Sequence, residues 1–354
     1  MATVHLAEIG DSLVAVKQLK DDLADDEVYR GMFVDEARLA TRLRHRHIVR
    51  THELARDGDR WLMVMELLEG ASLQQIRSKL GLDAMPLALG VRVLVAALDA
   101  LHHAHELRGD DGRPLGVVHR DVSANNVFVT FDGDVKVIDF GVAKSAAQRA
   151  VTKIGVVKGS VPYMAPDHVD GGTIDRRADV FAVGVLLREM LTGARLWGEA
   201  DDLSIVRRLI ARELPAFPAG VAAPPRLRAI VDRATRPLRD ERYGTALEMK
   251  AALEAWLREA APRVTLEALG AWMRSELAAE RTATASRRKQ AGAVWLPSSD
   301  LRTRLFAKPP PLPRERRWKR AALALALVAL GAVLGAIVDD AHEARENAAV
   351  TQTE

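Results

Sequence analysis

The stretch 117–141, which reads VVHRDVSANNVFVTFDGDVKVIDFG, constrains the fold of this chain more than any other. Two runs rich in β-branched residues, Val127–Phe131 and Val135–Ile138, flank the pair Asp132-Gly133. An Asp-Gly pair between such runs is a strong signal for a two-residue hairpin turn, because both turn positions require positive φ. The sequence therefore predicts a β-hairpin here.

This hairpin predicts a metal site at its open end. With Asp132 and Gly133 in the turn, Asn126 stands directly opposite Asp139, and facing residues lie about 5 Å apart at Cβ. Two oxygen-bearing side chains directed at one point suit a hard cation such as Mg²⁺. Asp121 lies five residues before Asn126. Its carboxylate is close enough to share the site.

The same residues resemble the catalytic and metal-binding loops of protein kinases: His119-Arg120-Asp121 with Asn126, then Asp139-Phe140-Gly141. Further segments resemble other kinase motifs in the same order: Val14-Ala15-Val16-Lys17, Glu36, Met65-Glu66-Leu67-Leu68, the run from Gly159 to Asp167, Asp179, Gly184 and Arg242. The chain is most similar to bacterial serine/threonine kinases of the type found in myxobacteria.

The resemblance implies an α+β, bilobal fold for a kinase domain over residues 1–258. Residues 1–68 would form a small β-rich lobe, with Glu36 on its one helix. Residues 69–258 would form a mainly helical lobe, and Leu266–Ala279 also has a helical pattern.

The resemblance also implies a role for each catalytic position. Asp121 would orient or accept the proton of a Ser or Thr hydroxyl on a protein substrate. Arg120, just before it, indicates control by phosphorylation of the activation segment, because a guanidinium favours an anionic partner there. Thr152 is the first candidate for that modification and Ser145 the second. Ser123 stands where most serine/threonine kinases have Lys, so the transfer rate is expected to suffer.

ATP and Mg²⁺ are the implied cofactors. Lys17 would pair with the α- and β-phosphates, held by Glu36, and Asn126 and Asp139 would hold Mg²⁺. The remaining positions assigned to the nucleotide are Val4, on the first strand, and the hinge residues Glu66 and Leu68, which would hold adenine through backbone groups.

Besides Ser123, two further features depart from the kinase pattern. No Gly-rich loop precedes Lys17, so we expect that Met1 is an internal methionine and that the first strand is missing from the sequence. The rival interpretation is a true truncation with weak ATP binding, and with it a pseudokinase that serves as a scaffold without turnover. Asp167 replaces the usual Glu opposite Arg242, which predicts a looser ion pair.

Residues 321–338, AALALALVALGAVLGAIV, form an apolar run of eighteen residues. As a helix it would be roughly 27 Å long, close to the thickness of the hydrocarbon layer. Basic residues abut its start and Asp339 and Asp340 its end. The positive-inside bias therefore predicts a single span in the inner (cytoplasmic) membrane, with a cytoplasmic kinase domain and an exported tail, 339–354.

Between the expected kinase domain and the predicted span lies a linker, residues 259–320, that is helical at first and then basic and Pro-rich. Residues 281–320 hold twelve Lys or Arg against two acids. The net charge of the whole chain is only +3, because acidic residues elsewhere offset this basic segment. Because this segment leads into the span, contact with anionic lipid is a simpler interpretation than nucleic-acid binding. Gly331 and Gly335 would allow two spans to pack as a homodimer, although glycine is also common in spans generally.

Other residues favour structural roles. His102, His103 and His105 are not spaced to place three ligands on one helix face, and His45 and His47 fit a loop. The absence of cysteine excludes a thiolate zinc site and a Cys nucleophile within this sequence.

Overall fold

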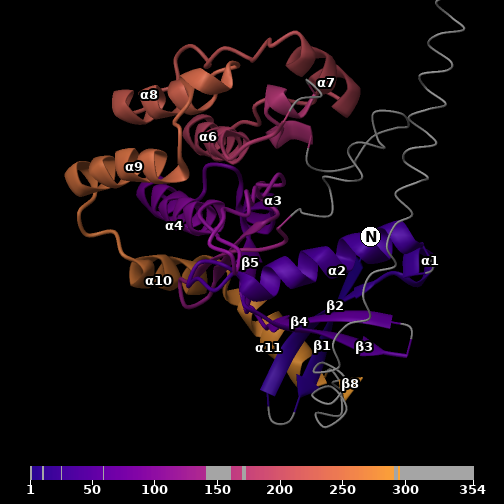
Figure 1. Cartoon of the computed structure of the whole chain (residues 1–354). Helices are drawn as coiled ribbons and strands as arrows, with labels where there is room; N and C mark the ends of the chain where they lie inside the picture. The colour runs from indigo at the N-terminus through magenta and orange to yellow at the C-terminus, as the bar shows by residue number, and fades with distance from the viewer. Residues whose placement is uncertain are drawn as a thin grey trace, which may run out of the picture. The chain divides into compact units, whose positions relative to one another are not determined.

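The computed structural model describes residues 2–9, 12–24, 26–58, 60–140, 161–169, 173–290 and 294–295. The chain separates into two compact units, Met1–Leu305 and Phe306–Glu354, and the second lies wholly outside the described residues. The predicted span, the exported tail, Ser145, Thr152 and most of the basic segment are therefore also outside them. Everything below concerns the first unit (Figure 1).

A five-stranded sheet forms the small lobe, in the order β3-β4-β2-β1-β8. Its strands are β1 (Ala2–Ile9), β2 (Ser12–Leu19), β3 (Thr51–Asp57), β4 (Arg60–Glu66) and β8 (Val294–Trp295). The first four pair antiparallel, and β8 pairs parallel with β1. Alternation along β2 buries Val14 and Val16 on one face, which leaves Lys17 on the other.

A short helix, α1 (Asp21–Ala24), and a long one, α2 (Glu27–Arg42), follow β2. The Asp26 carboxylate caps α2 by accepting hydrogen bonds from the N–H groups of Val28 and Tyr29. The buried face of α2 includes Phe33 and Ala37, which pack against β4. Figure 1 shows α2 lying across the sheet. This packing fixes the side from which Glu36 approaches β2.

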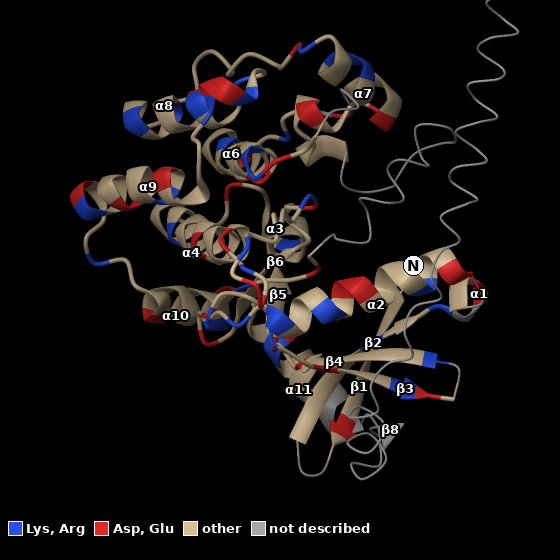
Figure 2. Ribbon diagram, viewed as in Figure 1, with Lys and Arg blue, Asp and Glu red and all other residues tan. Residues whose placement is uncertain are grey.

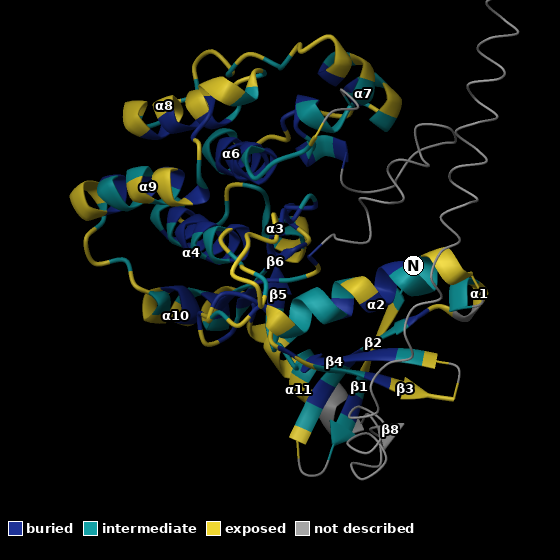
Figure 3. Ribbon diagram, viewed as in Figure 1, coloured by how far each residue is buried: buried dark blue, intermediate teal, exposed yellow. Residues whose placement is uncertain are grey.

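The large lobe is helical and surrounds two buried helices, α4 (Leu87–His105) and α6 (Arg177–Thr192) (Figure 3). Of the helices in the described part of the chain, α4 alone has the length and apolar character of a membrane span. Its burial in the core accounts for that sequence. The other helices are α3 (Leu73–Leu80), α7 (Asp202–Ile210), α8 (Pro225–Ala234), α9 (Ala246–Ala260), α10 (Leu266–Glu276) and α11 (Ala278–Gln290).

The large lobe continues past residue 258. Leu269, Met273 and Leu277, on and just after α10, are fully buried in the same core cluster as α4 and α6. The helix expected over Leu266–Ala279 is therefore present as α10 and belongs to the lobe rather than to a separate linker.

The predicted hairpin is present, but its register differs by one residue. It consists of β6 (Val127–Thr130) and β7 (Val135–Val137), with β5 (Gly70–Ser72) on the other side of β6. The Thr130 N–H donates to the Asp134 carbonyl at 2.8 Å, which closes a loop of three residues rather than two. Gly133, with φ of +92°, takes the left-handed position that such loops require.

The longer loop changes which residues face each other. Val127 pairs with Val137, and the Ile138 N–H donates to the Asn126 carbonyl at 3.0 Å. The prediction that Asn126 stands directly opposite Asp139 was therefore wrong by one residue. Asp139 follows as the next residue and has a φ of +55°, so the chain turns there.

The two lobes are joined beside this hairpin. The segment after α2 runs along β7, with the Val137 N–H donating to the His47 carbonyl at 2.8 Å and the Val49 N–H to the Val137 carbonyl at 3.0 Å. The segment after α2 and the hairpin with the predicted metal ligands are thus connected through backbone hydrogen bonds.

Candidate active site

Lys17, Glu36 and Asp139 meet where the two lobes face each other. The sequence predicted that Glu36 holds Lys17, but it did not predict the contact of Lys17 with Asp139. Lys17 Nζ lies 2.8 Å from Glu36 Oε1 and 2.6 Å from Asp139 Oδ1. β2 supplies the lysine, α2 the glutamate, and the turn after β7 the aspartate. Figure 2 shows the charged residues along α2, the helix that carries Glu36. One ammonium group therefore bridges both lobes.

The electrostatics of this cluster keep Lys17 charged. Burial alone would lower the pKa of Lys17, but the carboxylates of Asp139 and Glu36 outweigh it and raise that pKa above its usual value. The Asp139 side chain is 46% exposed, whereas those of Lys17 and Glu36 are each 12% exposed. Asp139 is thus the member of the cluster that solvent or a ligand can reach.

Val4 lies opposite Lys17 in the β1–β2 ladder. Directly opposed residues of an antiparallel pair project from the same face. Val4 is 63% exposed, so it offers apolar surface on the face that carries Lys17. This location fits the nucleotide contact expected of it.

Asp121 and Asn126 form a second pair, in the loop before β6. The Asn126 amide Nδ2 donates to the Asp121 carboxylate Oδ2 at 2.9 Å and to the Asp121 main-chain carbonyl at 2.8 Å. Both residues are buried, and the Asn126 N–H also donates to the Ser123 carbonyl at 3.1 Å. Asn126 therefore fixes the orientation of the Asp121 carboxylate.

Ser123 and Arg120 are held in the same loop. Ser123 is 1% exposed, so this predicted catalytic position is packed inside the loop. Arg120 has a φ of +64°, a conformation that costs energy for a residue with a side chain. Its N–H donates to Asp179 Oδ1 at 2.9 Å. This bond offsets part of that cost.

Asp179, on α6, holds the loop of His119, Arg120 and Asp121 through hydrogen bonds to its backbone. Its carboxylate also accepts the His119 N–H at 2.8 Å and lies 2.7 Å from His105 Nε2. Burial alone would raise the pKa of Asp179, but the hydrogen bond and charge of His105, with the His119 N–H, lower it below its usual value. Asp179 is therefore a buried anion with several donors, as such a group requires.

His119 links this loop to the metal-binding turn. Its Nδ1 accepts the Asp121 N–H at 3.2 Å, so the other nitrogen, Nε2, carries the proton that bonds to the Ile138 carbonyl at 3.1 Å. Its ring lies 4.6 Å from that of Phe140. The residues on either side of Asp139 are thus connected to the Asp121 loop.

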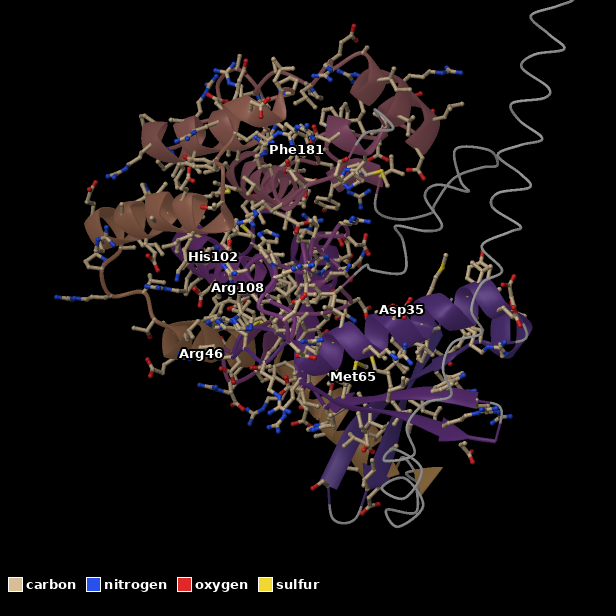
Figure 4. The ribbon with its side chains drawn as sticks, in the orientation of Figure 1. Asp35, Arg46, Met65, His102, Arg108 and Phe181 are labelled. Atoms are coloured by element: carbon tan, nitrogen blue, oxygen red, sulfur yellow. The ribbon has the colours of Figure 1, made fainter. Side chains whose placement is uncertain are left out.

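The hinge residues lie at the end of β4. Met65, which is labelled in Figure 4, packs in one hydrophobic cluster with Phe33 of α2. The Glu66 carboxylate accepts hydrogen bonds from the Arg50 N–H at 2.7 Å and from Lys136 Nζ at 2.7 Å. The side chain is therefore bound to protein groups. Leu68 packs at the edge of the same cluster as Met65. The Glu66 N–H donates to the Arg50 carbonyl at 2.9 Å. The contact of adenine with the backbone of Glu66 and Leu68 stays a prediction.

Arg242 and Asp167 form a close pair, so the prediction of a looser one was wrong. Arg242 Nη1 lies 2.5 Å from Asp167 Oδ2, and the Arg242 side chain is fully buried. Its other nitrogens donate to the carbonyls of Arg236 and Pro237, and its guanidinium carbon lies 5.0 Å from the ring centroid of Phe181, which is labelled in Figure 4.

The donor set suits Mg²⁺ bound together with phosphate. Among the described residues no group of three or more His, Cys, Asp or Glu side chains is arranged to hold a metal by itself. Mg²⁺ commonly binds through one or two carboxylates with phosphate oxygens and water completing its shell. The exposed Asp139 carboxylate and the Asn126 amide oxygen fit that requirement.

The sequence did not indicate a third cluster, which joins α3 and α6 through Tyr163. Arg77 of α3 donates to Glu189 of α6 at 2.5 Å and to the Tyr163 hydroxyl at 2.6 Å, and that hydroxyl donates to Glu189 at 3.0 Å. Burial and the Glu189 charge raise the pKa of Tyr163 above its usual value. No motif linked these three residues, which come from distant parts of the chain.

Comparison with known proteins agrees with this geometry. The family described as protein kinase domain matches residues 3–245. The chain is 38% identical over 295 residues to the tyrosine-protein kinase MasK of Myxococcus xanthus, covering 81% of this chain and 46% of MasK. It is 36% identical over 252 residues to the serine/threonine-protein kinase PknL of Mycobacterium tuberculosis, covering 71% and 61%. The chain thus spans about half the length of these relatives.

The fold has solved counterparts as well. The crystal structure of the M. tuberculosis PknI kinase domain superposes with a TM-score of 0.53 at 24% identity, covering 72% of this chain and 91% of that domain. At this identity the likeness concerns the fold, and it confirms a sheet-based small lobe and a helical large lobe.

Proposed function

The chain belongs to the protein kinase family, and from this premise we propose that it transfers the γ-phosphate of ATP to Ser and Thr hydroxyls of proteins in bacterial signalling. The observation that carries the proposal is the bridge from Lys17 to Glu36 and Asp139, at 2.8 and 2.6 Å. It places a cation fixed by one lobe next to an exposed carboxylate supplied by the other.

Lys17 is suited to bind phosphate. Glu36, 2.8 Å away on α2, supports its charge independently of Asp139, which comes from the other lobe. When the phosphates of ATP enter, they replace Asp139 as the anionic partner of Lys17. Asp139 is then available, with Asn126, to hold Mg²⁺, which neutralises charge on the phosphate oxygens when bound.

Asp121 is suited to receive the acceptor hydroxyl. Asn126 orients its carboxylate through the 2.9 Å hydrogen bond, and Asp179 fixes the backbone just before it through Arg120. Asp121 would then orient the substrate hydroxyl toward the γ-phosphorus and take its proton. The new bond from the hydroxyl oxygen to phosphorus forms as the bond from phosphorus to the β-phosphate oxygen breaks, and ADP leaves. Phosphoryl transfer depends mainly on such positioning and on charge neutralisation.

The acceptor class is the finer part of the proposal. PknL and the Bacillus subtilis kinase PrkC, 32% identical over 257 residues, are named serine/threonine-protein kinases, whereas MasK is named a tyrosine-protein kinase. The full chain, given labelled ATP and Mg²⁺ with a mixed protein substrate, should yield phosphoserine and phosphothreonine on acid hydrolysis. Phosphotyrosine alone would contradict the Ser/Thr assignment.

The same assay separates an enzyme from a scaffold. Asp121→Asn should abolish transfer, and Asp232→Asn, at an exposed position on α8, should retain it as a matched control. Absence of transfer by the unaltered chain, with Mg²⁺ and ATP both saturating, would support a pseudokinase.

We further propose that residues 321–338 anchor the kinase in the inner membrane, with residues 281–320 on anionic lipid. The support is the apolar run and the basic segment before it. The full chain should remain in the membrane pellet after carbonate extraction, and replacing Leu327 and Leu330 by Arg should release it. Release of the unaltered chain would refute the anchor.

A further inference from the structure

The start of α10 lies against the loop of the metal-binding hairpin. A Cβ added to Gly133 would lie 2.0 Å from the Leu266 carbonyl oxygen and 2.8 Å from the Gly270 nitrogen. A Cβ added to Gly270 would lie 2.6 Å from the carbonyl carbon and oxygen of Asp132. Backbone therefore meets backbone, and only glycine leaves room on both sides.

Gly270 is the glycine on the helix side of this contact. Because helix interiors disfavour glycine, its presence within α10 indicates a local steric requirement. Gly270 lies within α10 and is flanked by good helix formers, Leu269 and Ala271. Its contact with the Asp132 carbonyl explains why a larger residue is absent.

Arg274 adds a directed bond one turn later. Its Nη1 donates to the Phe131 carbonyl at 2.8 Å and lies 3.7 Å from Asp132 Oδ1. The helix itself is held in place, since Leu269 and Met273 are fully buried and Arg92 of α4 donates to the Val264 carbonyl at 3.0 Å. All three loop residues, 131–133, thus contact a fixed helix.

The two strands of this hairpin end at the metal-binding residues. Asn126 immediately precedes β6, and Asp139 lies two residues after β7. A displacement of the loop is transmitted along both strands, because their ladder is continuous from Val129–Val135 to Val127–Val137.

We propose that α10 positions the Mg²⁺-binding residues, with Gly270 and Arg274 acting through the hairpin loop on Asn126 and Asp139. This inference rests on the proposed function, since it concerns the metal that the kinase reaction uses. It assigns a part in that reaction to a helix outside the segment 3–245 that matches the kinase family.

The test measures how a non-hydrolysable ATP analogue binds to the full chain as Mg²⁺ is titrated. Gly270→Ala should raise the Mg²⁺ concentration for half-maximal binding by about 10-fold, the usual scale for altering groups that orient metal ligands. Analogue affinity in EDTA should stay unchanged. Gly31→Ala is the matched control, because a Cβ there meets nothing within 4 Å although Gly31 also lies in a helix.

Arg274 provides a second route that does not depend on the tolerance of Gly270. Arg274→Met removes the donor to Phe131 but keeps an apolar stem, and it should shift the Mg²⁺ requirement in the same direction. Arg274→Lys keeps a cationic donor and should restore most of the wild-type value. Hydrogen exchange at the amides of Gly133 and Asp134, measured without metal, should be faster in Arg274→Met than in Arg274→Lys.

The outcomes are distinct. A raised Mg²⁺ requirement with unchanged binding in EDTA supports the inference. An unaltered requirement in Gly270→Ala and Arg274→Met overturns it, and so does an equal loss with and without Mg²⁺, which marks a general structural role. If the unaltered chain shows no Mg²⁺-dependent binding, the proposed function fails as well.

Discussion

Asp139 and Asp179 are two aspartates of one lobe in opposite circumstances. The Asp139 side chain is 46% exposed and contacts the Lys17 ammonium, whereas that of Asp179 is 1% exposed and accepts hydrogen bonds from His105, His119 and Arg120. The first can exchange its partner for a ligand, because water and phosphate can replace a lysine. The second cannot, because two of its donors are backbone N–H groups of the loop that it holds and the third is the buried His105 side chain.

The difference indicates how the site divides its tasks. Asp179 keeps the loop that carries Asp121 in a conformation that costs energy at Arg120. Under the proposed function, Asp139 would exchange its ion pair with Lys17 for a metal. Substitutions at the two positions should therefore separate stability from activity.

The largest effect is expected at Asp179. Asp179→Ala leaves His105 and two backbone N–H groups without their acceptor in a buried site, so the free energy of unfolding should fall by about 3–5 kcal/mol. Urea denaturation followed by tryptophan fluorescence measures this change. A loss no greater than that of Asp232→Asn would show that the buried anion is dispensable.

Next in size is the effect of Asp139→Asn on rate. Removal of the charge should slow phosphate transfer by roughly 10²–10³-fold, since Mg²⁺ would lose its carboxylate ligand and the phosphate oxygens part of their charge neutralisation. The free energy of unfolding should change by less than about 1 kcal/mol, because the Lys17–Asp139 pair is partly exposed. Steady-state kinetics and urea denaturation of one preparation test both parts. A large loss of stability would remove the contrast with Asp179.

Asp167 gives an intermediate case. Asp167→Asn leaves the buried Arg242 guanidinium without its anionic partner, and the free energy of unfolding should fall by about 1–3 kcal/mol. Asp167→Glu keeps the charge and should recover most of that loss. Equal stability of both variants would mean that the carbonyls of Arg236 and Pro237 suffice for Arg242.

The smallest effect is the pH dependence that Asp179 produces. Its pKa is lower in the folded chain than in the unfolded one, so the folded state binds fewer protons and the stabilisation is complete above about pH 4. It is lost as the pH falls through the lowered pKa of the folded state. Urea midpoints between pH 6 and pH 3 should therefore fall less steeply in Asp179→Asn than in the wild type. Parallel curves would contradict the assignment.

The sequence allowed prediction of the site wherever chemistry is tied to a short motif. Lys17 and Glu36 were expected to pair, and they do, because each motif fixes one element and packing of α2 on the sheet brings the elements together. The contact of Lys17 with Asp139 was not predicted. The register of the hairpin was missed by one residue. Asp132-Gly133 is also compatible with a three-residue loop, and the hydrogen bonds of Thr130 with Asp134 that select it form only in the folded structure.

The contribution of α10 was not predictable either. Gly270 reads as a weak position in a helix, and nothing near it in the sequence points to a hairpin loop more than a hundred residues earlier. The same holds for Tyr163 with Arg77, which tertiary packing alone brings together.

The central claim is that Asp139 exchanges Lys17 for a metal that accompanies ATP. Isothermal titration of the full chain with a non-hydrolysable ATP analogue, with Mg²⁺ and with EDTA, tests it most directly. The account predicts binding that Mg²⁺ strengthens in the wild type and no longer strengthens in Asp139→Asn. Equal affinity with and without Mg²⁺ in the wild type, or the same Mg²⁺ effect in both proteins, would contradict it.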